Sequence, residues 1–222
     1  MIESVAFENA TTKYAGEAVA AQANEGASAA PPTGPLAIGN YVKHGHGVEI
    51  NKEEGTRYEG KFKMGKHHGK GKLVYEMTGD SYDGEWVEGE IHGEGRFVFS
   101  NGDIFAGEFD NNQMKQGIMN RANGDEYAGD FVNDLFIGYS LYKYANGDIY
   151  CGDFLKGKMN GNGVLKIKQS KFDYAGKFEN NQLVHGQVMT NEGEFLGEFA
   201  PNTRAFHGRG IMKHKSGDVY DG

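Results

Sequence analysis

The sequence is poor in cysteine and proline. Its 222 residues include a single cysteine, Cys151, and four prolines. One cysteine excludes an internal disulfide and a zinc site built from cysteines, and nothing in the cysteine usage calls for an oxidising compartment. So few prolines, without a glycine at every third position, exclude a collagen-like chain. We therefore expect a cytoplasmic protein.

Basic residues and long apolar runs are also scarce. Lys and Arg number 23 against 31 Asp and Glu, which gives a formal charge of −8. Nucleic-acid binding requires clustered Lys and Arg to neutralise phosphates, so we expect no nucleic-acid partner. No stretch approaches the roughly 20 apolar residues that a membrane-spanning helix needs.

Glycine, in contrast, is abundant: 35 of the 222 residues are glycine, and 12% are aromatic. Ordinary domains contain about 7% glycine. The aromatic content is too high for a flexible glycine-rich linker. A glycine load of this size weakens an ordinary helix or strand, which indicates an architecture other than a thick globular core.

A repeat explains the excess. An aromatic-x-Gly-x-aromatic element, as in Tyr82–Trp86, recurs at intervals of 21 to 25 residues. Its aromatic, glycine and second aromatic stand at i, i+2 and i+4, so on a strand all three face one side. The aromatic positions are Tyr58, Phe62, Tyr82, Trp86, Phe105, Phe109, Tyr127, Phe131, Tyr150, Phe154, Tyr174, Phe178, Phe195 and Phe199.

Turn residues separate the strands of each repeat. Three residues after the second aromatic stands a residue type that tolerates positive φ, at Gly65, Gly89, Asn112, Asp134, Gly157, Asn181 and Asn202. A returning strand carries a further glycine column, and an exit turn, often Asn-Gly-Asp, follows it. Each repeat is thus predicted to be a β-hairpin.

The best-defined repeat resembles a MORN (membrane occupation and recognition nexus) repeat. Tyr82-Asp83-Gly84-Glu85-Trp86 is followed by Gly89, then by His92-Gly93-Glu94-Gly95 and Asn101-Gly102-Asp103. The resemblance implies an all-β fold, an elongated single-layer antiparallel sheet of stacked hairpins. It covers residues 36–222, with about seven full repeats and partial repeats at both ends.

Residues 1–35 differ from the repeats. They are rich in alanine and end in Pro31-Pro32-Thr33-Gly34-Pro35. Alanine contributes little burial, and the helix that propensity would allow over residues 12–23 is marginal in isolation. We expect a tail that is disordered or ordered only by a partner.

The sequence contains no recognisable group of catalytic or metal-binding residues. Gly60-x-x-x-x-Gly65-Lys66 and its counterpart at Gly152 lack the Ser or Thr of a phosphate-binding loop. Five of the eight histidines form a repeat column, and equivalent positions in successive hairpins lie about 9–10 Å apart, too far to share an ion. We expect no enzyme activity, no metal and no cofactor.

Two surfaces are candidates for binding. Rings on one face of a single-layer sheet have no second layer to cover them, and exposed apolar surface commonly marks an interaction site. The predicted aromatic face comprises Tyr58, Phe62, Tyr82, Trp86, Phe105, Phe109, Tyr127, Phe131, Tyr150, Phe154, Tyr174 and Phe178. The second candidate is a basic patch of Lys61, Lys63, Lys70 and Lys72, which suits anionic lipid or an acidic protein. Its alternative is a solvated polar face.

The resemblance implies a non-enzymatic scaffold that binds other proteins in a cytoskeletal assembly, with the ciliary or flagellar axoneme as the first location. Two alternatives stay open. One is a peripheral membrane tether that binds acidic phospholipids, and the other is a regulatory MORN segment of a larger protein. Tyr220-Asp221-Gly222 opens a new strand, which predicts an exposed sheet edge. End-to-end homodimerisation, or pairing with a partner strand, could cover that edge.

Overall fold

The computed structural model describes residues 2–20, 37–38, 41–170, 172–201 and 205–222. All regular structure in these ranges is β-strand. The chain divides into two compact units, unit 1 (Met1–Gln113) and unit 2 (Met114–Gly222), and each is described by itself.

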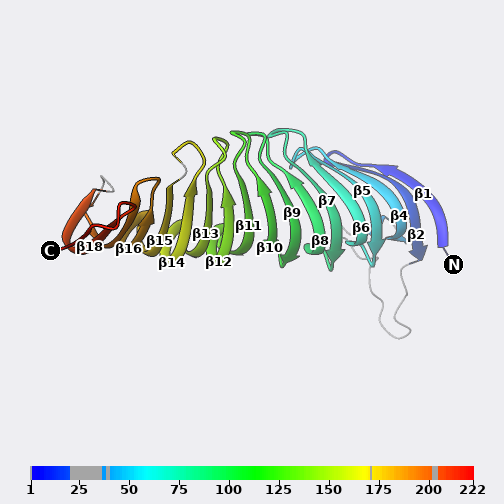
Figure 1. The fold of residues 1–222 in the computed structure, drawn as a ribbon. Helices are drawn as coiled ribbons and strands as arrows, with labels where there is room; N and C mark the ends of the chain where they lie inside the picture. Colours follow the sequence, from blue (N-terminus) through cyan, green and yellow to red (C-terminus); the bar gives the residue numbers. More distant parts are fainter. Residues whose placement is uncertain (1, 21–36, 39–40, 171, 202–204) are drawn as a thin grey trace, which may run out of the picture. The chain divides into compact units, whose positions relative to one another are not determined.

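Unit 1 is an open antiparallel sheet in which consecutive strands pair, except that β2 pairs with β4 and β3 also borders β4 (Figure 1). Its strands are β1 (Ile2–Glu8), β2 (Thr12–Ala20), β3 (Ala37–Ile38), β4 (Tyr41–Asn51), β5 (Thr56–Lys63), β6 (Lys66–Tyr75), β7 (Ser81–Val87), β8 (Glu90–Val98) and β9 (Ile104–Asp110).

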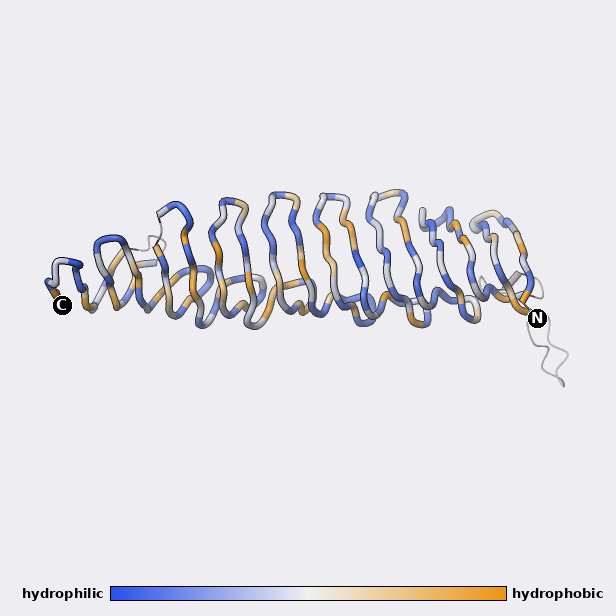
Figure 2. Tube along the Cα trace, turned by 45° about the vertical axis from the view of Figure 1, so that its right-hand side comes forward, coloured by the Kyte–Doolittle hydropathy of each residue, from blue (hydrophilic) through white to orange (hydrophobic). Residues whose placement is uncertain are grey.

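Unit 2 repeats the arrangement, with every strand antiparallel to the next along the chain. Its strands are β10 (Gln113–Asn120), β11 (Glu126–Val132), β12 (Leu135–Lys143), β13 (Ile149–Leu155), β14 (Lys158–Ile167), β15 (Phe172–Glu179), β16 (Gln182–Met189), β17 (Gly193–Phe199), β18 (Phe206–His214) and β19 (Val219–Asp221). Hydrophobic and hydrophilic residues are interspersed along the array (Figure 2). The predicted fold class, an all-β single-layer sheet of stacked hairpins, is confirmed.

The predicted hairpin tips are two-residue turns with positive φ at both positions. Met64 and Gly65 have φ of 48° and 85°, and Asn111 and Asn112 have 49° and 66°. Such turns match the twist of antiparallel strands, which explains the Gly, Asn and Asp found there. Asn202, the last predicted tip, lies outside the described residues.

Seven hairpins are kinked by a bulge on the return strand, whereas the pairs between neighbouring hairpins keep a continuous register in the described residues. Gly60 pairs with Gly71 and Phe62 with His67, so two extra residues of β6 lie between the two pairs. Gly69, within this stretch, has φ of 62°, a left-handed conformation that favours glycine. The bulge bends the strand, and the bend brings the two aromatic rings of a repeat together.

The N-terminal segment differs from the predicted tail. Residues 2–20 form β1 and β2, and Tyr14-x-Gly16 of β2 faces Gly47 of β4 as the first half of the leading repeat. The pattern was missed because Ala18 replaces the second aromatic and because residues 21–40 lengthen the connection to β4. The helix that propensity allowed from residue 12 is a strand instead. Residues 21–36 lie outside the described part of the chain, so a boundary near residue 35 stays a prediction.

Candidate interaction surfaces

The predicted aromatic face is the core of each unit and not an exposed surface. Eleven of its twelve rings are no more than 5% exposed, and Tyr174 is half-buried. The expectation of exposed rings is therefore corrected. The physical reason is the bend of the strands, which lets each ring cover the next in edge-to-face contacts, such as 5.0 Å between the centroids of Tyr58 and Phe62.

Glycine makes room for these rings. A Cβ on Gly71 would lie 2.1 Å from the Tyr58 hydroxyl oxygen, because the ring lies flat over the Gly60–Gly71 pair. The hydroxyl donates to the Lys61 carbonyl at 2.9 Å, and Tyr82 donates to the Glu85 carbonyl at 3.0 Å. The same bond, from a tyrosine to the carbonyl three residues on, recurs at Tyr14, Tyr127 and Tyr150.

A second set of side chains on the inner face, the face that carries the rings, stays partly exposed. It lies at or just after the end of four return strands, four residues after the second return glycine, at Tyr75, Phe99 and Ile167, with Tyr144 at the equivalent place. We call it the groove row. Sequence reasoning passed over it, although the fixed offset from the return glycine was a usable signal.

In unit 2 the groove row borders a cavity of about 500 Å³. Arg121 lies 5.2 Å from the Phe136 ring centroid, and Tyr142 donates to Asp125 Oδ2 at 2.8 Å. The cavity thus has an aromatic and aliphatic floor with charged and amide groups on its rim. It is lined by Arg121, Phe136, Tyr142, Tyr144, Asn146, Asp148, Phe154, Gly157, Met159, Leu165, Ile167 and Asn181.

A charged cluster interrupts the apolar interior of unit 1. Lys43, 2% exposed, forms an ion pair with Glu49, and His67 Nε2 lies 3.2 Å from Glu49 Oε2. His67 also stacks on Tyr58, with 3.6 Å between ring centroids. Burial by itself raises the pKa of Glu49, but the bond to His67 and the charge of Lys43 outweigh it, so the net pKa is below its ordinary value.

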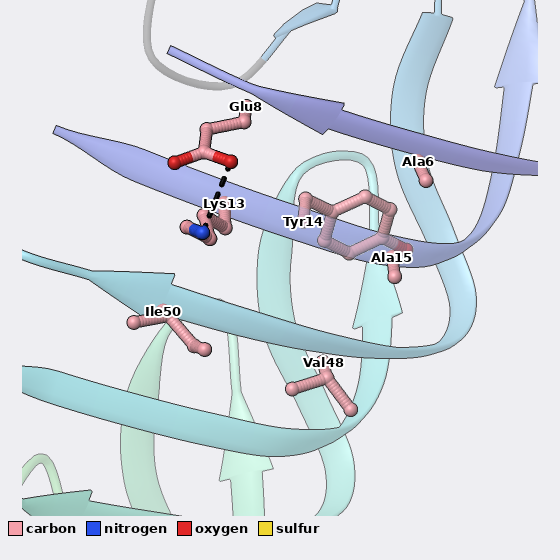
Figure 3. Close-up of a pocket in the computed structure, with 7 residues that line it drawn as sticks. All are labelled: Ala6, Glu8, Lys13, Tyr14, Ala15, Val48 and Ile50. Atoms are coloured by element: carbon pink, nitrogen blue, oxygen red, sulfur yellow. Dashed lines mark ion pairs between the residues drawn. The ribbon is translucent and has the colours of Figure 1, made fainter. Parts of the chain in front are cut away.

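A cavity of about 400 Å³ lies at the N-terminal end of unit 1 (Figure 3). Its walls are aliphatic, with Ala6, Val48 and Ile50 from β1 and β4. Glu8 lies at its rim and pairs with Lys13 at 3.0 Å. Neither this cavity nor the charged cluster was anticipated, because the cavity is lined by β1 and β2 and the cluster packs against β2, and both strands were predicted to be a tail.

The structure brings the four lysines of the basic patch together on the outer face, opposite the rings, where all are exposed. Acids accompany them. Lys72 lies between Glu59 and Asp83 in the pairing register, and Lys70 Nζ is 3.2 Å from Glu85 Oε1. The surface is therefore mixed in sign, which agrees with the solvated-face alternative and gives a weaker field for anionic lipid than the sequence suggested.

No group of three or more His, Cys, Asp or Glu side chains is placed to hold a metal ion among the described residues. None of the described residues forms a helix long and apolar enough to cross a membrane.

The repeat geometry agrees with comparison to known families. The family model described as MORN repeat matches residues 58–77, 82–104, 127–149 and 150–168. The chain contains MORN repeats. The MORN strands in these segments supply the rings, glycines and turns described above, and the matched residues include both units. MORN repeats support a role in binding other molecules.

Comparison with curated proteins gives no match. Among solved structures, the chain is similar to the TCP10c domain of Drosophila melanogaster Sas-4, with 12% identity over 69% of this chain and 91% of that chain and a TM-score of 0.39. It is also similar to the Drosophila SAS-4 (dCPAP) TCP domain in complex with a proline-rich motif of Ana2 (dSTIL), with 11% identity over 87% and 95% and a TM-score of 0.41.

Proposed function

We propose that this chain is a non-enzymatic scaffold whose MORN array binds another protein along the groove row of unit 2. The observation that supports it best is the cavity of about 500 Å³ at Tyr142, Tyr144 and Ile167. Half-buried aromatic side chains beside an apolar floor are typical anchors of protein interfaces. Arg121 and the Nδ2 group of Asn181, whose Oδ1 accepts from Met159 N, can donate hydrogen bonds to the backbone of an extended segment.

We further propose that the assembly served by this scaffold is cytoskeletal, with the axoneme of a cilium or flagellum as the first place to look. The MORN repeats motivate this assignment by analogy alone. The lipid-binding alternative is less favoured, because acidic side chains lie next to the lysines of the basic patch and reduce its positive potential. Imaging of the tagged protein in ciliated cells tests the assignment, and a diffuse signal that detergent extraction removes would contradict it.

The groove is tested by quantitative affinity purification of the wild type and of the double variant Tyr144→Ala/Ile167→Ser. Truncation of two central anchors should weaken capture of the specific partners at least about tenfold, because such residues carry most of the binding energy. Circular dichroism verifies that the variant keeps its sheet.

The matched control is Tyr75→Ala, which removes a ring at the same repeat position in unit 1. It should leave the captured proteins unchanged. Equal capture by the groove variant and the wild type would place the binding site elsewhere, and equal loss with the control would show a general effect of weakened hairpins.

A further inference from the structure

The outer face of unit 2 carries an apolar line that the fold itself does not require. One outward side chain from each strand lies directly opposite the next in the pairing register, and eight of the nine are apolar or cysteine. This central row is Ile118, Ala128, Leu141, Cys151, Val164, Ala175, Gln187, Leu196 and Ile211.

In unit 1 the same repeat position is apolar on the first strands, at Ala6, Ala15 and Val48, and charged on the next four. There β5, β6, β7 and β8 place Glu59, Lys72, Asp83 and Arg96 in succession, and the row ends at Ala106. Ile118 and Leu196 are 44% and 46% exposed, while the rest of the central row is half-buried. A solvated outer face has no need of aliphatic side chains, so the central row indicates a surface that another molecule covers.

A flanking row nearer the exit turns is charged in a particular order. From β11 to β18 it reads acid, base, apolar, base, acid, apolar, acid, base. Its members are Glu126, Lys143, Ile149, Lys166, Asp173, Met189, Glu194 and Lys213. In the reverse order, from β18 to β11, a base stands wherever the forward order has an acid, and an acid wherever it has a base. The two apolar residues exchange places.

We propose that the outer face of unit 2 binds a second copy of this chain, face to face, about a two-fold axis that runs parallel to the strands between β14 and β15. Rotation about such an axis leaves each residue at the same height along the strand direction but reverses the order of the strands. Strand β14 therefore faces β15 of the second copy, β13 faces β16, β12 faces β17 and β11 faces β18. Each row therefore meets itself in reverse, as a symmetric dimer requires.

The flanking row is then complementary at every position. Lys143 faces Glu194 of the second copy, Lys166 faces Asp173, and Glu126 faces Lys213. Ile149 faces Met189. In the central row Leu141 faces Leu196, Val164 faces Ala175, and Cys151 faces Gln187.

The third outward row, nearer the bulges, has no like-charge contact in the same arrangement. Its members are Asp130, Tyr139, Asp153, Asn162, Lys177, His185, Glu198 and His207. Asp153 faces His185 of the second copy, Tyr139 faces Glu198, and Asn162 faces Lys177. Within the chain, Lys143 pairs with Glu126 at 2.6 Å and Lys166 with Asp173 at 4.0 Å. The two-fold axis sets each of these pairs against a pair of the opposite order, which favours a second copy over an unrelated partner.

The size of the face fits a specific dimer. Eight strands at about 4.8 Å spacing and three rows at about 6.6 Å cover about 750 Å². Standard interfaces bury about 800 Å² on each partner.

Sedimentation equilibrium of the full chain provides the first test, with the expected result a dimer. Lys143→Glu places two acids face to face twice per dimer and should weaken dimerisation at least about tenfold. Adding Glu194→Lys should restore it, because the facing pair is again opposite in sign. Ala106→Glu, at the central-row position of unit 1, is the control and should have no effect.

A cross-linking test separates this arrangement from strand pairing at the β19 edge. Cys151 lies three strands from Cys151 of the second copy, about 14 Å along the interface, so the wild type should not react with a short bis-maleimide. Gln187→Cys places a thiol opposite Cys151 of the second copy and should give a cross-linked dimer, which Cys151→Ser abolishes.

Two outcomes would overturn the proposal. One is a wild-type chain that stays monomeric at high concentration. The other is a dimer that Lys143→Glu does not weaken and that Gln187→Cys does not cross-link, which would place the interface at the sheet edge or in unit 1. Circular dichroism of each variant verifies folding, so a misfolded variant is not counted as either outcome.

Discussion

At the residue scale, the cluster of Lys43, Glu49 and His67 stands where neighbouring repeats have apolar side chains. Lys43 and His67 occupy the column of Ile91, and Glu49 pairs with Tyr14 as Leu73 pairs with Tyr58. The first repeat has Ala18 instead of a second ring, and the long Lys43 side chain fills the space beside Tyr14 and Phe62, with its Nζ 5.7 Å and 5.6 Å from their ring centroids. The long aliphatic part of the Lys43 side chain thus provides packing that an aromatic ring provides in other repeats.

Lys43→Met tests this cluster. Loss of the cation leaves a half-buried carboxylate with the His67 ring as its remaining hydrogen-bond partner in the cluster and should lower the free energy of unfolding by about 3 kcal/mol. The double change Lys43→Met/Glu49→Leu removes both charges and should recover most of that loss, since paired charges and a well-packed apolar pair of similar volume are often equivalent. Urea unfolding measures both, and a double variant no more stable than the single one would contradict the account.

The pH dependence follows from the same cluster. The pKa of Glu49 is below its ordinary value of 4.5, so its contribution to stability is present above that pH and is lost as pH falls through the lower, folded-state value. In Lys43→Met the pKa should rise, and the acid loss of stability should begin at higher pH than in the wild type.

At the element scale, the bent hairpin depends on glycine at two kinds of position. The glycines beneath the rings provide space, and the bulge and turn glycines provide a left-handed conformation. The distinction can be tested because the chain itself uses Asn at some turns, as at Asn112 and Asn181, but keeps glycine beneath the ring at Gly71.

Gly71→Ala should therefore destabilise strongly and Gly89→Asn weakly. The alanine Cβ would fall 2.1 Å from the Tyr58 hydroxyl oxygen, displace the ring and break its bond to the Lys61 carbonyl, for a loss of about 3 kcal/mol. At Gly89, with φ of 94°, asparagine should cost less than about 1 kcal/mol. Thermal unfolding compares the two, and equal losses would show that conformation and not space governs both sites.

The sequence was sufficient for the hairpins and insufficient for the surfaces, for a physical reason. A period of two and turn residues with positive φ determine strands and tips locally, so Tyr82–Trp86 and Gly89 could be placed without a structure. Exposure depends on how far the strands bend, and the bend comes from bulges such as that at Gly69. The rings were therefore expected at the surface but lie inside, and the groove row was overlooked.

The surface rows follow the same logic. Central-row residues are scattered through the sequence at intervals of about one strand, and only the pairing register brings Leu141, Cys151 and Val164 into line. Similarly, β2 was missed because its repeat lacks a second ring. Local patterns predict local structure, while a surface requires the register of every strand that contributes to it.

At the scale of the whole molecule, the buried tyrosines couple ionisation to unfolding across both units. Burial raises the pKa of Tyr14 to about 12 and raises the pKa values of Tyr82, Tyr127 and Tyr150 in the same direction. An unfolded tyrosine ionises near pH 10. Because the folded pKa is the higher one, the tyrosines contribute their full stabilisation below pH 10, and that contribution falls as pH rises toward the folded values.

An alkaline titration should therefore be cooperative. Within each unit, phenolate absorbance from the buried tyrosines should rise in one step that coincides with loss of the β-sheet circular dichroism signal, because a ring can ionise only when its hairpin opens, and adjacent hairpins share ring contacts such as that between Tyr150 and Phe178. Tyr82→Phe serves as the matched control, since Phe105 and Phe195 already occupy this position in other repeats. It should remove one phenolate from the step and leave the step's pH nearly unchanged. Phenolate formation complete while the circular dichroism signal is intact would mean that water reaches the rings in the folded array, and the buried aromatic column would then not be the element that holds the sheet together.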